Sequence, residues 1–293
     1  MLEVIALFGP TGVGKTEVAI ALADLLRVRK ERPIAISADA LQVYEGLETL
    51  TGVASERDQA RLEHRLVSFV PVDQEFSVGE FMPRAHAEID AALEAGRRPI
   101  VVGGTGLYLR AALTDLDLKP PPPPELRARI EAEVEQRGTK EAHARLSPSA
   151  AATIEPTDRS RIIRALELAE MGQDGEPSGT SQLWTTDTRH PTLLFGLTMD
   201  REALYARIDE RVDAMVSAGV EDEVRRAAAT ASRTARKALG FEDLTNGDVD
   251  AMKRRTRNYA KRQLTWMRKL PGVELVDLTG RHPDDVAARL LDP

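Results

Sequence analysis

Residues 9–16 read GPTGVGKT, an octapeptide that fits the spacing G-x-x-x-x-G-K-[ST]. A short apolar run, residues 1–8 (MLEVIALF), precedes it, and apolar side chains take up helical spacing from Lys15 to Leu26. The glycines let backbone N–H groups converge on a phosphate chain at the positive end of this helix, where Lys15 can neutralise charge and the Thr16 hydroxyl can ligate Mg²⁺. The predicted diphosphate-binding residues are Gly9, Pro10, Thr11, Gly12, Val13, Gly14, Lys15 and Thr16.

Strands and helices alternate through the first 118 residues. Residues 33–37 (PIAIS) and 99–102 (PIVV) are apolar runs typical of buried parallel strands, and a loop follows each of them. Between them, Val78–Ala95 has apolar residues every three or four positions, which predicts a helix that ends at Gly96. The alternation predicts the α/β class, with a P-loop NTPase-like doubly wound parallel sheet.

Five consecutive prolines, residues 120–124, mark a boundary because proline continues neither a helix nor a central strand. Helical patterns alone follow, over 125–135, 141–146 and 159–171. A strand over 192–198, a helix over 201–217 and a strand over 273–278 then resume the α/β pattern. We therefore expect an α-helical insertion domain at 120–190, between the first part of the core, 1–119, and its completion, 191–293, which includes a basic C-terminal helix.

The composition excludes several classes of site. The 293 residues include no cysteine, which excludes disulfides, zinc–thiolate sites and thiol catalysis. The five histidines show no metal-ligand spacing. No apolar stretch reaches the length of a membrane span, and the first residues lack a basic segment, so we expect a cytoplasmic protein with no membrane partner. We also expect a monomer.

Charge is distributed unevenly along the chain. The 40 Lys and Arg against 47 Asp and Glu give a net charge of −7, which taken alone argues against a nucleic-acid partner. Residues 251–270, however, contain eight basic residues and no acidic one, among them Arg254, Arg255 and Arg257. This helix is either a solvated surface helix or a phosphate-binding face, and Tyr259 and Trp266 within it are either stacking platforms or core anchors.

Two further loops are expected beside the phosphate loop, because ligands of open parallel sheets lie beyond the carboxyl ends of the strands. Asp39 follows the second strand, and it could be an outer ligand of Mg²⁺, a helix N-cap or a base toward a second substrate. Thr105 follows Gly103 and Gly104, which either form a simple turn or allow a ligand to approach the backbone closely.

Five segments in order carry a family resemblance that covers the chain to about Lys269: GPTGVGKT, SADALQVY, PIVVGGTGLYL, DRSRIIRALEL and RRTRNYAKRQLTWMRK. Together they resemble the tRNA dimethylallyltransferase (tRNA isopentenyltransferase) family. The resemblance implies transfer of the prenyl group of dimethylallyl diphosphate to the exocyclic N6 amine of the adenosine 3′ of the anticodon. It also implies Mg²⁺ as cofactor, the tRNA anticodon stem-loop as partner and an ATP-type loop that holds an allylic diphosphate.

The same resemblance assigns roles to individual residues. Asp39 matches the general base, Thr105 a residue that positions the reacting groups, and Arg211 an arginine assigned to the diphosphate. The residues that match tRNA contacts are Asp39, Ala40, Leu41, Gln42, Thr105, Arg127, Ser160, Arg161, Ile162, Ile163 and Arg164. With Arg254, Arg255 and Arg257 of the basic helix, these form the expected tRNA-binding set.

The chain departs from the family pattern on the tRNA side of the expected site. Ala40 stands where serine is common, Glu45 where arginine is usual, and residues 50–55 replace a Gly-Thr-Ala-Lys-Pro-like stretch.

Two alternative functions would act on small molecules: that of an adenylate isopentenyltransferase that makes a cytokinin, and that of a P-loop kinase. A non-catalytic tRNA-binding protein or P-loop regulator is a third. The helical insertion and the basic helix disfavour the first two, and the retained Lys15, Thr16, Asp39 and Thr105 disfavour the third.

Overall fold

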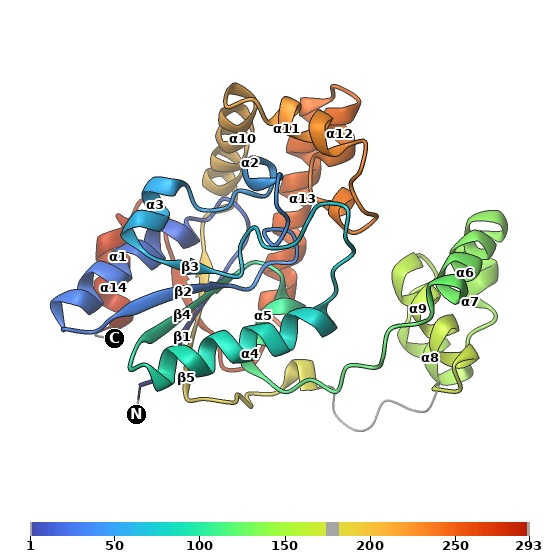
Figure 1. The fold of residues 1–293 in the computed structure, drawn as a ribbon, viewed down its shortest axis with the longest axis horizontal. Coiled ribbons are helices and arrows are strands. Elements are labelled where there is room, and N and C mark those ends of the chain that lie inside the picture. Colours follow the sequence, from blue (N-terminus) through green and yellow to red (C-terminus); the bar gives the residue numbers. More distant parts are fainter. Residues whose placement is uncertain (1, 174–181, 292–293) are drawn as a thin grey trace. The chain divides into compact units, whose positions relative to one another are not determined.

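A parallel six-stranded sheet forms the centre of the computed structural model, which describes residues 2–173 and 182–291 (Figure 1). Its strand order is β3-β2-β4-β1-β5-β6, and all neighbours run parallel. The strands are β1 (Val4–Phe8), β2 (Pro33–Ser37), β3 (His64–Arg65), β4 (Arg98–Gly103), β5 (Thr192–Thr198) and β6 (Glu274–Asp277). The predicted doubly wound α/β fold is confirmed.

Helices cover both faces of this sheet (Figure 1). Helix α1 (Lys15–Val28) packs against α14 (Pro283–Leu291) on one face, whereas α4 (Val78–Glu94) packs against α5 (Gly106–Leu113) on the other. Right-handed crossovers require this division, because the chain moves outward from β1 to β2 but back toward the centre from β3 to β4. The helices with the sheet are α1 (Lys15–Val28), α2 (Glu48–Thr51), α3 (Glu56–Arg61), α4 (Val78–Glu94), α5 (Gly106–Leu113), α10 (Arg201–Ser217), α11 (Val220–Ala227), α12 (Phe241–Thr245), α13 (Val249–Met267) and α14 (Pro283–Leu291).

Local sequence explains where several of these helices begin. Ser77 and Glu80 form a reciprocal capping box at the start of α4. Asp200 accepts hydrogen bonds from two backbone N–H groups of α10. Helix α1 differs, because its N-cap is Gly14 in a left-handed conformation (φ 108°) and no side chain caps it. The first N–H groups of α1 are therefore available to an anion.

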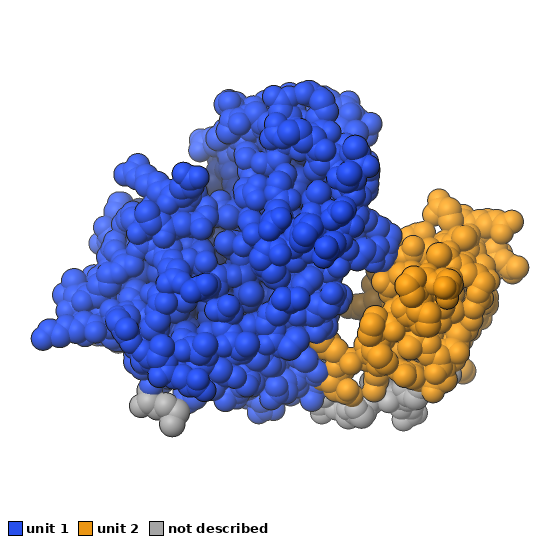
Figure 2. Space-filling model, in the orientation of Figure 1, with its two compact units in different colours: residues 1–116, 182–293 blue, residues 117–181 orange. Residues whose placement is uncertain are grey.

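The chain divides into two compact units, residues 1–116 with 182–293 and residues 117–181 (Figure 2). The second unit contains α6 (Pro124–Arg137), α7 (Thr139–His143), α8 (Pro148–Thr153) and α9 (Arg159–Glu170). Its small core includes Ile130, Val134, Ile162 and Leu166. Glu167 is fully buried there and accepts two hydrogen bonds from Arg127, at 2.7 and 2.8 Å, and one from Arg164 at 3.2 Å.

Residues 182–190 lie with the sheet unit, although they were expected in the insertion. The buried guanidinium of Arg110 on α5 donates to the carbonyl oxygens of Gln182 and Asp187, and Arg189 pairs with Asp90 of α4. These side-chain anchors act between segments about 70 to 100 residues apart in sequence, so no local pattern indicates them.

The predicted basic helix is α13. The helix predicted over 201–217 is α10, and Gly219, in a left-handed conformation (φ 86°), separates it from α11. Across the described residues, no helix is both long and apolar enough to cross a membrane.

Candidate functional site

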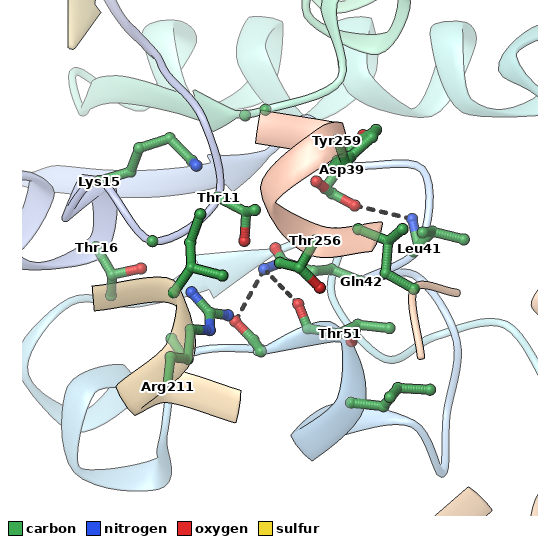
Figure 3. Close-up of a pocket in the computed structure, with 18 of the residues that line it drawn as sticks. Thr11, Lys15, Thr16, Asp39, Leu41, Gln42, Thr51, Arg211, Thr256 and Tyr259 are labelled. Atoms are coloured by element: carbon green, nitrogen blue, oxygen red, sulfur yellow. Dashed lines mark hydrogen bonds between the residues drawn. The ribbon is translucent and has the colours of Figure 1, made fainter. Parts of the chain in front are cut away.

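The carboxyl ends of β1, β2 and β4 meet at a cavity of about 250 Å³ in the sheet unit. Helices α10 and α13 supply the opposite wall (Figure 3). The predicted site residues that line the cavity are Thr11, Gly12, Gly14, Lys15, Thr16, Asp39, Leu41, Gln42 and Arg211. The structure thus brings together predicted residues from three separate segments of the sequence.

The first half of the phosphate loop is held by internal hydrogen bonds. The Lys15 ammonium donates to the carbonyl oxygens of Gly9 at 3.0 Å and Pro10 at 2.9 Å. Val13 is fully buried in the core, so its side chain supports the loop and does not face the cavity. Gly9, Pro10 and Val13 therefore shape the loop from behind, whereas residues 11, 12 and 14–16 face the cavity.

Cationic side chains concentrate around this loop. Burial lowers the pKa of Lys15 to about 8, although the nearby Asp39 carboxylate opposes this effect. Burial also lowers the pKa of Arg211, which extends from α10 into the cavity. Arg211 forms no ion pair with any carboxylate in the described part of the chain, whereas Arg207 of the same helix pairs with Glu17 at 3.2 Å. Two partly buried cations beside uncapped N–H groups form a site for a multivalent anion.

Gly52 gives the Arg211 guanidinium the space that it occupies. A Cβ atom at this position would lie 1.6 Å from an Arg211 nitrogen, and Gly52 has φ 64°. The carbonyl oxygen of Gly52 accepts a hydrogen bond from Gln42 Nε2 at 3.0 Å, and Gln42 Oε1 accepts one from the Ser37 hydroxyl at 2.9 Å. Through these two hydrogen bonds, Gln42 links the 50–55 segment to the end of β2.

Asp39 follows β2 and faces the cavity near Tyr259 (Figure 3). One carboxylate oxygen accepts a hydrogen bond from the backbone N–H of Leu41 at 2.9 Å. This contact fixes the side chain in a local turn and leaves the second oxygen available to a substrate. Asp39 is thus held as in an Asx turn, and it is also placed where a base is needed.

Thr105 and Ala40 do not line the cavity themselves. The Thr105 hydroxyl lies 3.2 Å from the hydroxyl of Tyr259, which does line it. Burial raises the pKa of Tyr259 to about 12, so its hydroxyl remains protonated at physiological pH. Tyr259 therefore belongs to the cavity wall.

Trp266 of α13 is partly buried and packs as a core anchor. Its ring packs edge-to-face on Phe8 at 5.7 Å between centroids and lies 4.8 Å from the ring of Trp184. Gly106 makes room for it, since a Cβ atom there would lie 2.2 Å from the indole.

The basic residues of α13 fall into two groups. Those of its first half pair with acidic residues of neighbouring elements: Lys253 with Asp213, Arg254 with Asp248, Arg255 with Asp243 and Arg257 with Asp209. Lys261 and Arg262 of α13, and Arg268 and Lys269 directly after its end, are exposed and form no ion pair with any described carboxylate. We call these four residues the unpaired basic face.

The remaining predicted tRNA contacts lie in the helical unit. Ser160 and Arg161 are exposed on α9, whereas Ile162 and Ile163 are buried in the core of that unit. The side chains of Ile162 and Ile163 are thus occupied by packing within that unit. Arg127 and Arg164 share the buried Glu167, and each remains about one-third exposed.

Gln263 is the main residue that sequence reasoning missed. Its buried side chain lines the cavity and bonds both the phosphate loop and the loop after β4. The available signal was its position in the buried stripe of α13, with Met252, Thr256, Ala260 and Met267. A polar residue in such a stripe needs a partner.

Matches to family models and to individual relatives indicate the same kind of protein. A model described as IPP transferase matches residues 42–270, and one described as Isopentenyl transferase matches residues 2–74. A tRNA dimethylallyltransferase from Symbiobacterium thermophilum is 41% identical to this chain, covering 95% of it and 90% of the relative. The protein of the same name from Kineococcus radiotolerans is 38% identical and covers 99% and 96%.

Solved structures of similar fold include proteins of the same kind. The full-length tRNA isopentenylpyrophosphate transferase from Bacillus halodurans has a TM-score of 0.71 at 32% identity, covering 99% of this chain and 94% of that protein. A eukaryotic dimethylallyltransferase acting on tRNA also has a TM-score of 0.71, at 24% identity over 95% of this chain and 74% of that protein, which is a likeness of fold.

Proposed function

Because the chain belongs to the IPP transferase family, we propose that it is a tRNA dimethylallyltransferase, which transfers the dimethylallyl group of dimethylallyl diphosphate to tRNA. We propose the exocyclic N6 amine of the adenosine 3′ of the anticodon as acceptor, with N6-isopentenyladenosine and diphosphate as products. One observation carries the proposal: a single cavity combines two partly buried cations, Lys15 and Arg211, with the carboxylate of Asp39. The cations can neutralise the charge of the diphosphate leaving group, and the carboxylate can take the proton of the acceptor amine.

The donor half of the reaction belongs to the phosphate loop. The bond between C1 of the prenyl group and the diphosphate oxygen breaks, and negative charge gathers on the departing diphosphate. Lys15, Arg211 and the N–H groups at the start of α1 are placed to stabilise that charge. Since two hydrogen bonds hold Lys15 in place before the substrate arrives, little reorganisation of this cation is needed during the step.

The acceptor half belongs to Asp39. The N6 amine forms a bond to C1, and its proton passes to the free carboxylate oxygen of Asp39 as that bond forms. The amine can reach the cavity only when the adenine leaves its stack, as in other enzymes that act on a base. Thr105 and Tyr259 lie beside this half of the cavity and contribute hydroxyl groups there.

Mg²⁺ is part of the proposal. Thr16 directs its hydroxyl toward the cavity (Figure 3), and no cluster of three or more His, Cys, Asp or Glu residues that could hold a metal occurs among the described residues. This donor set fits Mg²⁺, which is commonly bound by one or two protein ligands together with substrate phosphates. When bound, Mg²⁺ would neutralise part of the diphosphate charge.

The tRNA side of the proposal uses both units. In the helical unit, we propose Arg127, Arg164 and the exposed Ser160 and Arg161 as contacts. On α13, we propose the unpaired basic face in addition to Arg254, Arg255 and Arg257. Lysine and arginine that lack a protein carboxylate gain most from phosphate contact.

The test compares acceptors. The protein is incubated with Mg²⁺, dimethylallyl diphosphate and either unmodified tRNA, AMP or ATP, and prenylated adenosine is detected by mass. We expect transfer to tRNA alone. Transfer to AMP but not to tRNA would instead identify an adenylate isopentenyltransferase, and phosphoryl transfer from ATP would identify a kinase. Neither alternative is favoured, since the IPP transferase model spans residues 42–270 whereas the Isopentenyl transferase model spans residues 2–74.

A further inference from the structure

The side chain of Gln263 on α13 joins the two loops that frame the donor site. Its Oε1 accepts a hydrogen bond from the backbone N–H of Thr11 at 2.9 Å, and its Nε2 donates one to the carbonyl oxygen of Gly104 at 2.7 Å. Thr11 belongs to the phosphate loop after β1, and Gly104 belongs to the loop after β4 that carries Thr105. One side chain thus sets the spacing between the two loops.

Packing alone does not account for a glutamine at this position. Gln263 is 6% exposed, and it occupies the stripe of α13 that is otherwise suited to apolar side chains. A buried amide costs free energy unless both of its ends are bonded, whereas a methionine of similar length would fill the same space without that cost. Here both ends are bonded, and both bonds go to backbone groups of functional loops.

The bond to Thr11 completes the internal anchoring of the phosphate loop. Lys15 already occupies the carbonyl oxygens of Gly9 and Pro10, and Pro10 has no N–H group. Gln263 takes the next donor, the N–H of Thr11. Farther along, the Val13 N–H donates to the carbonyl oxygen of Pro10 at 3.3 Å, so the N–H groups of Gly12 and Gly14 and those at the start of α1 remain for phosphate.

The bond to Gly104 fixes the second loop at close range. A Cβ atom on Gly104 would lie 2.5 Å from Gln263 Nε2 and 3.4 Å from Lys15 Nζ. Only a residue without a side chain permits this approach. The loop that carries Thr105 is thus held against the lysine of the phosphate loop through Gln263.

We propose that Gln263 is a positioning residue for prenyl transfer: it holds the diphosphate loop and the Thr105 loop at the separation at which donor and acceptor react. The inference rests on the proposed function. It predicts that loss of the amide weakens diphosphate binding through Thr11 and slows the transfer step through Gly104.

The test replaces Gln263 with methionine, which keeps the length of the side chain and removes both hydrogen bonds. We expect Gln263→Met to raise the Kd of inorganic diphosphate and the KM of dimethylallyl diphosphate about tenfold, and to lower kcat about tenfold, as expected for the loss of one hydrogen bond in each state. The Kd of tRNA should change less than about twofold. Gln263→Asn, which keeps the amide but is one methylene too short to bond both loops, should change the same constants in the same direction.

Two control variants separate positioning from stability. Asn258→Met makes a similar change on the exposed face of the same helix and should leave all constants unchanged. Met267→Ala removes a buried side chain of α13 outside the cavity, so it should lower the melting temperature without raising KM. If Met267→Ala raised KM as much as Gln263→Met, the effect of Gln263 would be one of stability, and the inference would be wrong.

The outcomes also separate this inference from the proposed function. Wild-type protein that transfers nothing to tRNA would contradict the proposed function, yet the Kd of inorganic diphosphate would still report on Gln263. Active wild-type protein together with unchanged KM, kcat and diphosphate Kd in both Gln263 variants would overturn the inference alone. Should Gln263→Met fail to fold, Gln263→Asn decides by the same criteria.

Discussion

The hydroxyl oxygens of Thr105 and Tyr259 lie 3.2 Å apart, although 154 positions separate the two residues in the chain. Either group can donate, because burial raises the pKa of Tyr259 to about 12 and keeps its hydroxyl protonated. The pair fixes the side chain of Thr105 beside the acceptor half of the cavity. It therefore links α13 to the start of α5.

Removal of one hydroxyl from this pair should slow catalysis without weakening substrate binding. A hydrogen bond of this kind contributes about 0.5–1.5 kcal/mol, so Tyr259→Phe should lower kcat about two- to tenfold and leave the Kd of tRNA nearly unchanged. Single-turnover transfer and tRNA binding measure the two effects. Thr105→Val should give a loss of similar size, and the double variant should lose little more, because the two groups act as one unit. Additive losses would contradict this coupling.

Asp39→Asn tests the proposed base. Asparagine keeps an oxygen that can accept the hydrogen bond from the Leu41 N–H, so the local turn should survive. The amide cannot take the proton from the acceptor amine, and general-base catalysis contributes about 10²- to 10⁴-fold. We expect a single-turnover rate lower by that factor, with tRNA affinity retained. A variant with wild-type rate would remove Asp39 from this role.

Sequence patterns predicted the elements that carry strong periodicity. The predicted bounds of β2, β5 and α10 are the observed ones, because each is a buried apolar run or a long amphipathic repeat with a clear cap. The short elements α2, α8, α12 and β3 were not predicted. They have four to six residues, or two in β3, so tertiary packing rather than periodicity determines them.

The candidate site also contains both residues that the sequence predicted and residues that it did not. The phosphate loop, Asp39 and Arg211 were found from motif and resemblance, and the structure places them around one cavity. Gln263 was not found, since its partner Thr11 lies 252 positions away and no local pattern indicates that contact. The pairing of Arg254, Arg255 and Arg257 with acids was also hidden, because those acids lie on other elements or beyond the basic run.

The two halves of α13 should differ in their contribution to tRNA binding. Lys261→Glu with Lys269→Glu should weaken binding and reduce the slope of log Kd against log salt by about one per lost phosphate contact. Reversal of Arg254 and Arg255 should reduce that slope less, because Asp248 and Asp243 already face these side chains. Arg289→Glu on α14 makes the same charge change at an exposed site and serves as control. Equal slopes for wild type and the Lys261/Lys269 variant would contradict a role for the unpaired basic face.

Lys15 should make donor binding depend on pH. Burial lowers its pKa to about 8 in the free protein, so at pH 9 the Lys15 side chain is neutral in most molecules. A bound diphosphate favours the charged ammonium and raises this pKa, so binding above pH 8 must take up a proton. Phosphate monoesters lose their second proton near pH 6, so the ligand contributes little in this range. Affinity for dimethylallyl diphosphate should therefore be highest below pH 8 and fall by up to about tenfold per pH unit above it, the limit for one proton.

Calorimetry at pH 8.5 in two buffers of different ionisation enthalpy measures the proton uptake directly. In Lys15→Arg, whose guanidinium stays charged throughout this range, the uptake should vanish; equal uptake by both proteins would assign the proton to another group.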